Sequence, residues 1–240
     1  MMSGKYKYQR KYFTTSQFAD AKSQVSASHL YRLMLETSCL QLYEHYTSLE
    51  ELKRSGFAYI LSRVDIIFHK PIQLYREYLF STWARSSGIL KLFRNFTVEF
   101  GGDLAAEAST LWAAVDLNTR KLIKNTDVPD PVQCFDQDIT ADANNRIFIP
   151  EGLVKISEKK ISYSDLDLYD HMNNTKYVEL VCDILPLSLQ TLSRLRIDFV
   201  RECKLGEIIN IFYLADGNDH YVKGVKEDGS VSFNCHAVME

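Results

Sequence analysis

Carboxylate, imidazole, phenol and amide side chains are concentrated in residues 163–177, which read YSDLDLYDHMNNTKY. If residues 167–171 are extended, Asp167, Tyr169 and His171 point to one side, because side chains alternate along a strand. The apolar helix expected to follow begins with unpaired backbone N–H groups, which favour negative charge. A carboxylate, a phenol and an imidazole beside such a helix start can polarise a carbonyl group and activate a water molecule.

Each of these side chains also has an ordinary structural interpretation. An isolated Asp before a helix is usually a turn or capping residue, and a buried histidine is often bonded to the backbone. We favour a functional role for Asp167 and His171 because they occur together, whereas packing and catalysis are equally open for Tyr169. Asn174 is expected to cap the helix, and the role of Asn173 is left open.

The composition is that of a soluble globular protein, since 46% of the 240 residues are hydrophobic, 25% are charged and the net charge is −3. This charge gives no general attraction to nucleic acid, and no apolar run is long enough to cross a membrane. The five Cys are scattered, which favours reduced thiols over disulfides or a zinc site. Without a glycine-rich phosphate loop or a Cys/His metal pattern, we expect no cofactor and no metal. The N-terminus lacks the apolar core of a signal peptide, so we expect a cytoplasmic protein.

An internal repeat divides the chain into two halves. Residues 61–68 (LSRVDIIF) resemble residues 192–199 (LSRLRIDF), and this offset of 131 residues continues ungapped to Ala84 and Ala215. Each half combines helical periodicity with several strand-like runs. The helices are expected at 28–45, 48–56 and 174–185, and the strands at 57–68, 74–84, 89–100, 104–116, 153–162, 193–201, 207–215, 220–226 and 231–239. Asp-Gly pairs at 216–217 and 228–229 predict hairpin turns.

This order of elements predicts an α+β fold, a tandem (double) hot-dog in which each half is a long central helix wrapped by an antiparallel sheet. We place the first hot-dog at residues 1–124, a linker at 125–146 and the second hot-dog at 147–240. The linker contains Pro129 and Pro131, and its apolar Phe135 and Ile139 favour an ordered segment. Helix 174–185 is apolar around most of its circumference, so it is expected to be buried.

Three segments resemble the acyl-acyl-carrier-protein thioesterases, the double hot-dog enzymes that release fatty acids in plant plastids and in bacteria. Residues 164–167 (SDLD) and 171–177 (HMNNTKY) are similar to the family's S-D-L-D-x-N-x-H-x-N-N-x-K-Y motif. Residues 201–203 (REC) are similar to its R-E-C motif, and residues 108–112 (ASTLW) with 116–121 (DLNTRK) resemble the end of its first hot-dog. Without a transit peptide, the chain resembles the bacterial members.

The resemblance implies that the second hot-dog is catalytic and that the first shapes the acyl pocket. It places the catalytic residues at Asp167, His171 and Glu202, and it puts Tyr169 where the family has Asn. A tyrosine hydroxyl can donate a hydrogen bond but cannot mimic an amide, so Asn173 and Asn174 are alternative substrate-binding amides. A solvated carboxylate at a strand edge is the competing interpretation of Glu202. At the offset of 131 residues, the first half has Pro71 in place of Glu202.

The implied activity is hydrolysis of acyl-acyl carrier protein to free fatty acid, in fatty acid biosynthesis. Helix N–H groups near residues 173–176 would bind the carbonyl oxygen, with Glu202 as the first choice of base, and carboxylate attack remains an alternative to water attack. The implied partners are acyl carrier protein and a fatty acyl chain, with neither nucleic acid nor membrane insertion, and a homodimer is compatible with the sequence. Two rivals are an acyl-CoA thioesterase on the same fold and a catalytically silent acyl-binding module. Basic side chains that could meet an acidic carrier are Arg120, Lys121, Lys124, Lys155, Lys159 and Lys160.

Overall fold

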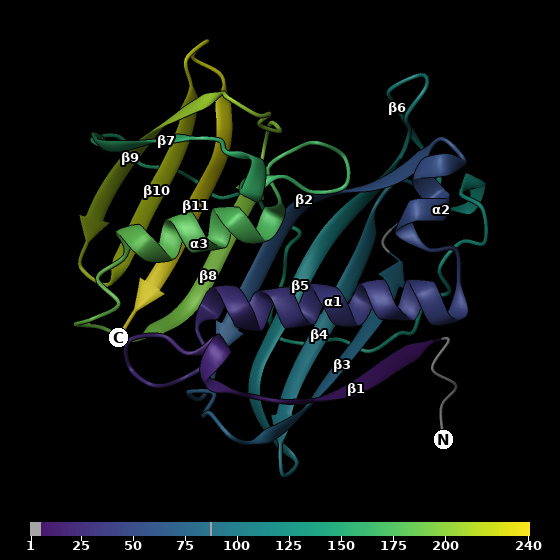
Figure 1. Ribbon diagram of the computed structural model, residues 1–240, viewed down its shortest axis with the longest axis horizontal. Coiled ribbons are helices and arrows are strands. Elements are labelled where there is room, and N and C mark those ends of the chain that lie inside the picture. The colour runs from purple at the N-terminus through teal and green to yellow at the C-terminus, as the bar shows by residue number, and fades with distance from the viewer. Residues whose placement is uncertain (1–5, 87) are drawn as a thin grey trace. The chain divides into compact units, whose positions relative to one another are not determined.

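The computed structural model describes residues 6–86 and 88–240, and it divides into two compact units between Asn144 and Asn145. Figure 1 shows the same pattern in both units, a helix lying against an antiparallel sheet. Most of the segment expected as a linker, residues 125–144, belongs to the first unit. Within the described residues, no helix combines the length and apolar character needed to cross a bilayer.

The first unit contains two helices and a sheet with the strand order β1-β3-β4-β5-β2, in which every pairing is antiparallel. Ser26 caps α1 by accepting a hydrogen bond from the His29 N–H, and Ser48 with Glu51 forms a capping box at α2. A short strand, β6, pairs with the end of β5. The elements are β1 (Lys7–Phe13), η1 (Ser16–Phe18), α1 (Ala27–His45), α2 (Leu49–Arg54), β2 (Phe57–Phe68), β3 (Glu77–Ser86), β4 (Leu92–Phe100), β5 (Asp103–Asp116), β6 (Lys121–Ile123) and η2 (Asn125–Asp127).

The sheet of the first unit is covered on both faces. Helix α1 lies across one face (Figure 1), where its Gln41 accepts a hydrogen bond of 2.6 Å from the buried Arg94 of β4. Residues 125–144 contribute to the cover of the other face, where Trp83 Nε1 donates to the Gln137 carbonyl at 2.8 Å. Covering on both faces explains why seven consecutive residues of β4 are buried instead of alternating.

The second unit has one helix and a sheet with the strand order β8-β11-β10-β9-β7, again antiparallel throughout. Its hairpin turns confirm the predicted Asp-Gly positions, since Gly217 and Gly229 both adopt positive φ. The expectation that helix 174–185 is buried all round is wrong, because Leu180 and Ile184 are only half-buried. The elements are β7 (Val154–Lys160), η3 (Tyr163–Asp165), α3 (Asn174–Ile184), β8 (Leu192–Phe199), β9 (Ile208–Asp216), β10 (Asp219–Lys226) and β11 (Val231–Met239).

Candidate active site

Residues 166–172 of the second unit form a closed turn that leads into α3. Leu166 and Met172 form an antiparallel bridge, and the Asp167 N–H donates to the His171 carbonyl at 2.8 Å. Asp170 adopts a φ of +63°, in the left-handed region. The condition of an extended segment is therefore not met, and side-chain alternation along a strand is not what arranges Asp167, Tyr169 and His171.

The Asp167 carboxylate supports the backbone of this turn. Its Oδ1 accepts hydrogen bonds from the N–H groups of Tyr169, at 2.8 Å, and His171, at 3.3 Å. This is an Asx-type turn, in which an Asp side chain bonds the backbone that follows it. Asp167 thus orients His171 through the main chain.

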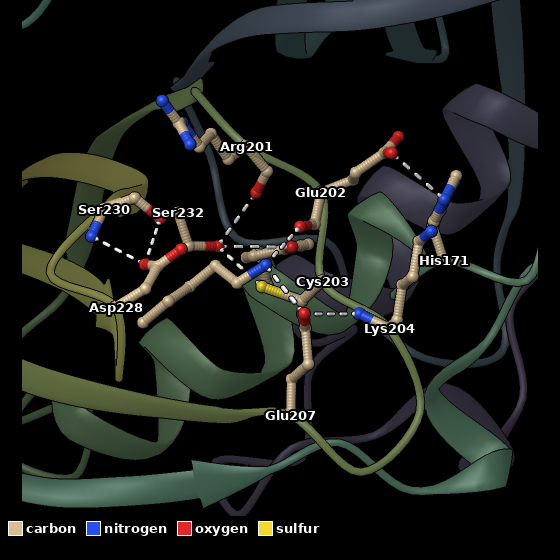
Figure 2. A network of polar contacts seen from close by, with 11 residues as sticks. His171, Arg201, Glu202, Cys203, Lys204, Glu207, Asp228, Ser230 and Ser232 are labelled. Carbon is tan, nitrogen blue, oxygen red and sulfur yellow. Dashed lines mark hydrogen bonds and ion pairs between the residues drawn. The ribbon is translucent and has the colours of Figure 1, made fainter.

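His171 and Glu202 are brought together. His171 Nε2 lies 3.2 Å from Glu202 Oε1, and Figure 2 shows the imidazole and the carboxylate facing each other. The two chain segments are joined by a bridge between His171 and Lys204 and by a 2.8 Å hydrogen bond from the Met172 N–H to the Cys203 carbonyl. The side chains are 26% exposed for His171 and 57% for Glu202. A contact this exposed contributes little to stability.

The start of α3 leaves one backbone donor available. Asn173 is the N-cap, and its Oδ1 accepts from the Thr175 N–H at 2.9 Å, so the prediction that Asn174 caps the helix is wrong by one residue. The N–H groups of Asn173 and Lys176 are also occupied, by the carbonyls of Asp165 and Asn173. Among the N–H groups of residues 173–176, only that of Asn174 has no hydrogen-bond partner within the described part of the chain. It can bind an oxygen of a ligand.

Tyr169 belongs to the same turn. Its N–H bonds the Asp167 carboxylate, its side chain is half-buried and its hydroxyl oxygen is buried. This placement establishes a role for its backbone in the turn.

Polar contacts that the sequence did not reveal lie beside Glu202 (Figure 2). Lys226 Nζ is 2.8 Å from Glu207 Oε2 and donates to the Glu202 carbonyl at 3.3 Å. The intervening Cys203 is buried, and its Sγ lies 3.0 Å from Ser232 Oγ. Burial raises the pKa of the Glu207 carboxyl, but hydrogen bonds from Lys226 and from the Lys204 N–H outweigh it, so this pKa lies below its usual value.

The first unit contains the same turn. Asp20, which precedes Asp167 by 147 residues, accepts hydrogen bonds from the N–H groups of Lys22, at 2.8 Å, and Gln24, at 3.2 Å. Ser23 has a φ of +60°, close to the value of Asp170. The turn built on an Asp is therefore a scaffold that both units share.

The two catalytic candidates are confined to the second unit. In the first unit the Val25 N–H donates to the Ile72 carbonyl at 2.8 Å, as Met172 does to Cys203. This match places Gln24 at the position of His171 and Pro71 at the position of Glu202. Neither Gln nor Pro titrates, so the first unit keeps the scaffold without the acid–base pair.

The fold and the site define a class. The chain is a tandem hot-dog protein that carries an imidazole–carboxylate pair beside the start of α3. Residues 5–131 match the acyl-ACP thioesterase N-terminal domain, and residues 151–236 match the acyl-ACP thioesterase C-terminal domain. The chain therefore belongs to the acyl-ACP thioesterase family.

Individual relatives are distant in sequence. The palmitoyl-acyl carrier protein thioesterase of Gossypium hirsutum is 22% identical over 211 residues, which is 82% of this chain and 50% of that protein. The oleoyl-acyl carrier protein thioesterase 2 of Arabidopsis thaliana is 21% identical over 237 residues, covering 88% of this chain and 63% of that protein. The chain thus spans between half and two thirds of the length of these two relatives.

Solved structures extend the similarity of fold to the whole chain. An acyl-ACP thioesterase from Bacteroides thetaiotaomicron superposes with a TM-score of 0.88 at 21% identity, covering 98% of both chains. The 12:0-ACP thioesterase from Umbellularia californica gives a TM-score of 0.82 at 17% identity, covering 98% of this chain and 97% of the other. The tandem hot-dog architecture predicted from the sequence is confirmed.

Proposed function

We propose that this protein hydrolyses fatty acyl thioesters of acyl carrier protein, giving free fatty acid and the carrier thiol. The observation that carries the proposal is the 3.2 Å contact between His171 Nε2 and Glu202 Oε1, beside the start of α3. Family membership supports the substrate class. The names of relatives specify thioesters of acyl carrier protein, which supports acyl carrier protein as the carrier here. These relatives include both palmitoyl and oleoyl thioesterases.

The proposed reaction is attack by water. His171 Nε2–H donates to Glu202 Oε1 and orients the carboxylate, so that Oε2 accepts a proton from the water molecule. The water oxygen bonds to the carbonyl carbon, and the oxyanion that forms accepts a hydrogen bond from the Asn174 N–H. One such donor contributes about 3 kcal/mol to transition-state stability. The carbon–sulfur bond then breaks, and the carrier thiolate takes up the proton.

Asp167 has a positioning role in this scheme. Its Oδ1 is occupied by two N–H groups of the turn. Asp20 makes the same contacts in a unit that lacks both His171 and Glu202. A residue kept for the scaffold of both units needs no catalytic explanation, so we favour base-assisted water attack over nucleophilic attack by Asp167.

The proposal includes a cytoplasmic location and acyl carrier protein as the donor. All five cysteines are free thiols, which supports a reducing compartment.

Of the basic side chains that could meet the acidic carrier, Lys159 pairs with Asp165 at 2.9 Å and Lys155 with Glu158 at 3.4 Å. Arg120, Lys121 and Lys124 therefore form the better candidate for docking. Light scattering of the purified chain decides between a monomer and a homodimer.

The test presents one acyl group on two carriers. Wild type is expected to hydrolyse the acyl carrier protein thioester, and His171→Ala and Glu202→Gln are each expected to lose about 10²–10⁴-fold in kcat. Glu227→Gln changes an exposed glutamate and serves as the matched control. Turnover of the coenzyme A thioester alone would identify an acyl-CoA thioesterase. Tight acyl binding without turnover, or unchanged rates in both site variants, would refute the proposal in favour of a binding module or another site.

Tyr169→Asn examines the residue that departs from the family motif. It introduces the amide that the resemblance implies at this position. Faster hydrolysis by the variant would show that Tyr169 slows the enzyme, whereas slower hydrolysis with a lower melting temperature would assign Tyr169 to packing of the turn.

A further inference from the structure

Residues 202–204, which carry Glu202, are held from one side by a lysine–glutamate pair. Lys226, the last residue of β10, reaches the Glu207 carboxylate at 2.9 Å from Oε1 and 2.8 Å from Oε2. The same ammonium group donates to the Glu202 carbonyl at 3.3 Å. Glu207 Oε2 also accepts a hydrogen bond of 2.9 Å from the Lys204 N–H. The pair therefore bonds the backbone on both sides of Cys203.

Both charged side chains are partly buried. The side chains are 17% exposed for Lys226 and 34% for Glu207. Removing charges from water is costly unless each is paired and hydrogen-bonded, and here each ion has both its counterion and a backbone partner. Such a pair gives modest stability but a defined geometry for the backbone between its ends.

The first unit shows that the loop does not need this ion pair in order to fold. There the Gln73 N–H, at the position of Lys204, donates to the neutral hydroxyl of Tyr78 at 2.9 Å. Pro71 occupies the position of Glu202 in that unit. The ion pair therefore accompanies the catalytic carboxylate rather than the loop, which suggests a role specific to Glu202.

We propose that Lys226 and Glu207 are positioning residues that hold Glu202 against His171 through the backbone of residues 202–204. For its catalytic consequence this inference rests on the proposed function. The His171 side chain pairs with Glu202, whereas Lys226 and Glu207 bond each other and the backbone of residues 202–204, so their influence on the imidazole passes through Glu202. A displacement of about 1 Å in a catalytic group costs about 100-fold in rate.

The first experiment is independent of activity. Crystal structures of full-length wild type, Lys226→Met and Glu207→Gln report the separation of His171 Nε2 and Glu202 Oε1, which is 3.2 Å in the native arrangement. In Lys226→Met we expect the Glu202 carboxylate to turn away and this contact to be lost. A contact preserved in both variants would overturn the inference. Glu207→Gln keeps an acceptor for the Lys204 N–H, so it provides a folded variant if Lys226→Met does not fold.

The second experiment measures kinetics. Lys226→Met is expected to lower kcat about 100-fold with little change in KM, because Lys226 is not among the side chains proposed to dock the carrier. Lys226→Arg keeps the charge and the donors and should recover kcat to within about fivefold of wild type. Lys223→Met is the matched control and should not change kcat, since Lys223 lies on the same strand and its side chain makes no hydrogen bond or ion pair with the described residues.

The two experiments separate the inference from the proposed function. A Lys226→Met enzyme with wild-type kcat and a lower melting temperature would reduce the pair to a structural role and overturn the inference. If wild type hydrolyses no thioester, the proposed function fails, and the crystallographic comparison alone still decides whether the pair positions Glu202.

Discussion

Substitution of Asp167 separates a scaffold role from a chemical role. Asp167→Asn keeps an oxygen acceptor in the same place but removes the charge, whereas Asp167→Ala removes both. If the carboxylate acts only through the turn, Asn should retain most of the activity and Ala should not. If the carboxylate is the nucleophile or the base, the two variants should be equally inactive.

The magnitude follows from the two hydrogen bonds to Asp167 Oδ1. The 2.8 Å bond from Tyr169 is strong and the 3.3 Å bond from His171 is long, and both are only partly buried. Hydrogen bonds to a charged acceptor contribute about 1.5–3 kcal/mol when well formed. After discounting for length and exposure, we expect Asp167→Ala to lower the free energy of unfolding by about 2 kcal/mol and Asp167→Asn by about 1 kcal/mol.

Asp20 provides the matched control, because its two bonds are 2.8 and 3.2 Å long. Asp20→Ala should cost a similar free energy of unfolding in denaturant titration. In the thioesterase assay, Asp167→Asn should keep kcat within about tenfold of wild type, and Asp167→Ala should lose about 100-fold as His171 shifts. A loss on the order of 10⁴ or more in Asp167→Asn, with stability intact, would refute the scaffold role and identify a catalytic carboxylate.

Three further predictions concern stability. A Cβ atom at Gly224 would lie 2.2 Å from a ring carbon of the buried Phe233, so Gly224→Ala should lower the free energy of unfolding by about 1–3 kcal/mol in chemical denaturation. The folded-state pKa of Glu207 lies below 4.5, so its stabilising contribution is present above that pH and is lost as the pH falls through the folded value. The melting temperature of wild type should therefore fall more steeply below pH 4.5 than that of Glu207→Gln, and parallel curves would contradict this assignment. Ser48→Ala removes the cap of α2 and should cost about 1 kcal/mol, measured by thermal unfolding.

Most of the fold could be predicted because its signals are local. Apolar alternation, the Asp-Gly turns and the proline after α3 each act within a few residues, and the strands came out within a few residues of their observed ends. Strand β1 was not predicted, because Lys7–Phe13 carries three basic residues and has little apolar alternation. It lies at the edge of its sheet, where charged residues are common. It pairs with β3, where Lys11 lies opposite Leu79, 68 residues further along the chain, so this pairing is set by the tertiary structure.

The candidate site could be predicted only in part. The residue types at 167, 171 and 202 were visible in the motifs, but their geometry was not. Asp170 adopts positive φ, and that conformation converts an apparent strand into a turn. An Asp followed by the N–H groups it can bond is a recognisable Asx-turn signal, and it was available at Asp167. The Lys226–Glu207 pair had no such signal, because its members lie 19 residues apart, with Glu207 in the loop before β9 and Lys226 at the end of β10.

Comparison of the two units shows which features are specific to the second unit. Both units have an Asp turn before the helix and a capped helix start. In both, a backbone hydrogen bond joins this turn to the loop after β2 or β8. These features serve folding, since they occur where Gln24 and Pro71 exclude acid–base chemistry. What differs is His171, Glu202 and the ion pair that bonds the backbone beside Glu202. An exposed imidazole–carboxylate contact gains too little free energy to hold itself in one geometry. In the second unit a charged pair bonds the backbone beside Glu202. The first unit bonds the corresponding backbone through the neutral hydroxyl of Tyr78. This contrast is the physical reason to propose that Lys226 and Glu207 belong to the site.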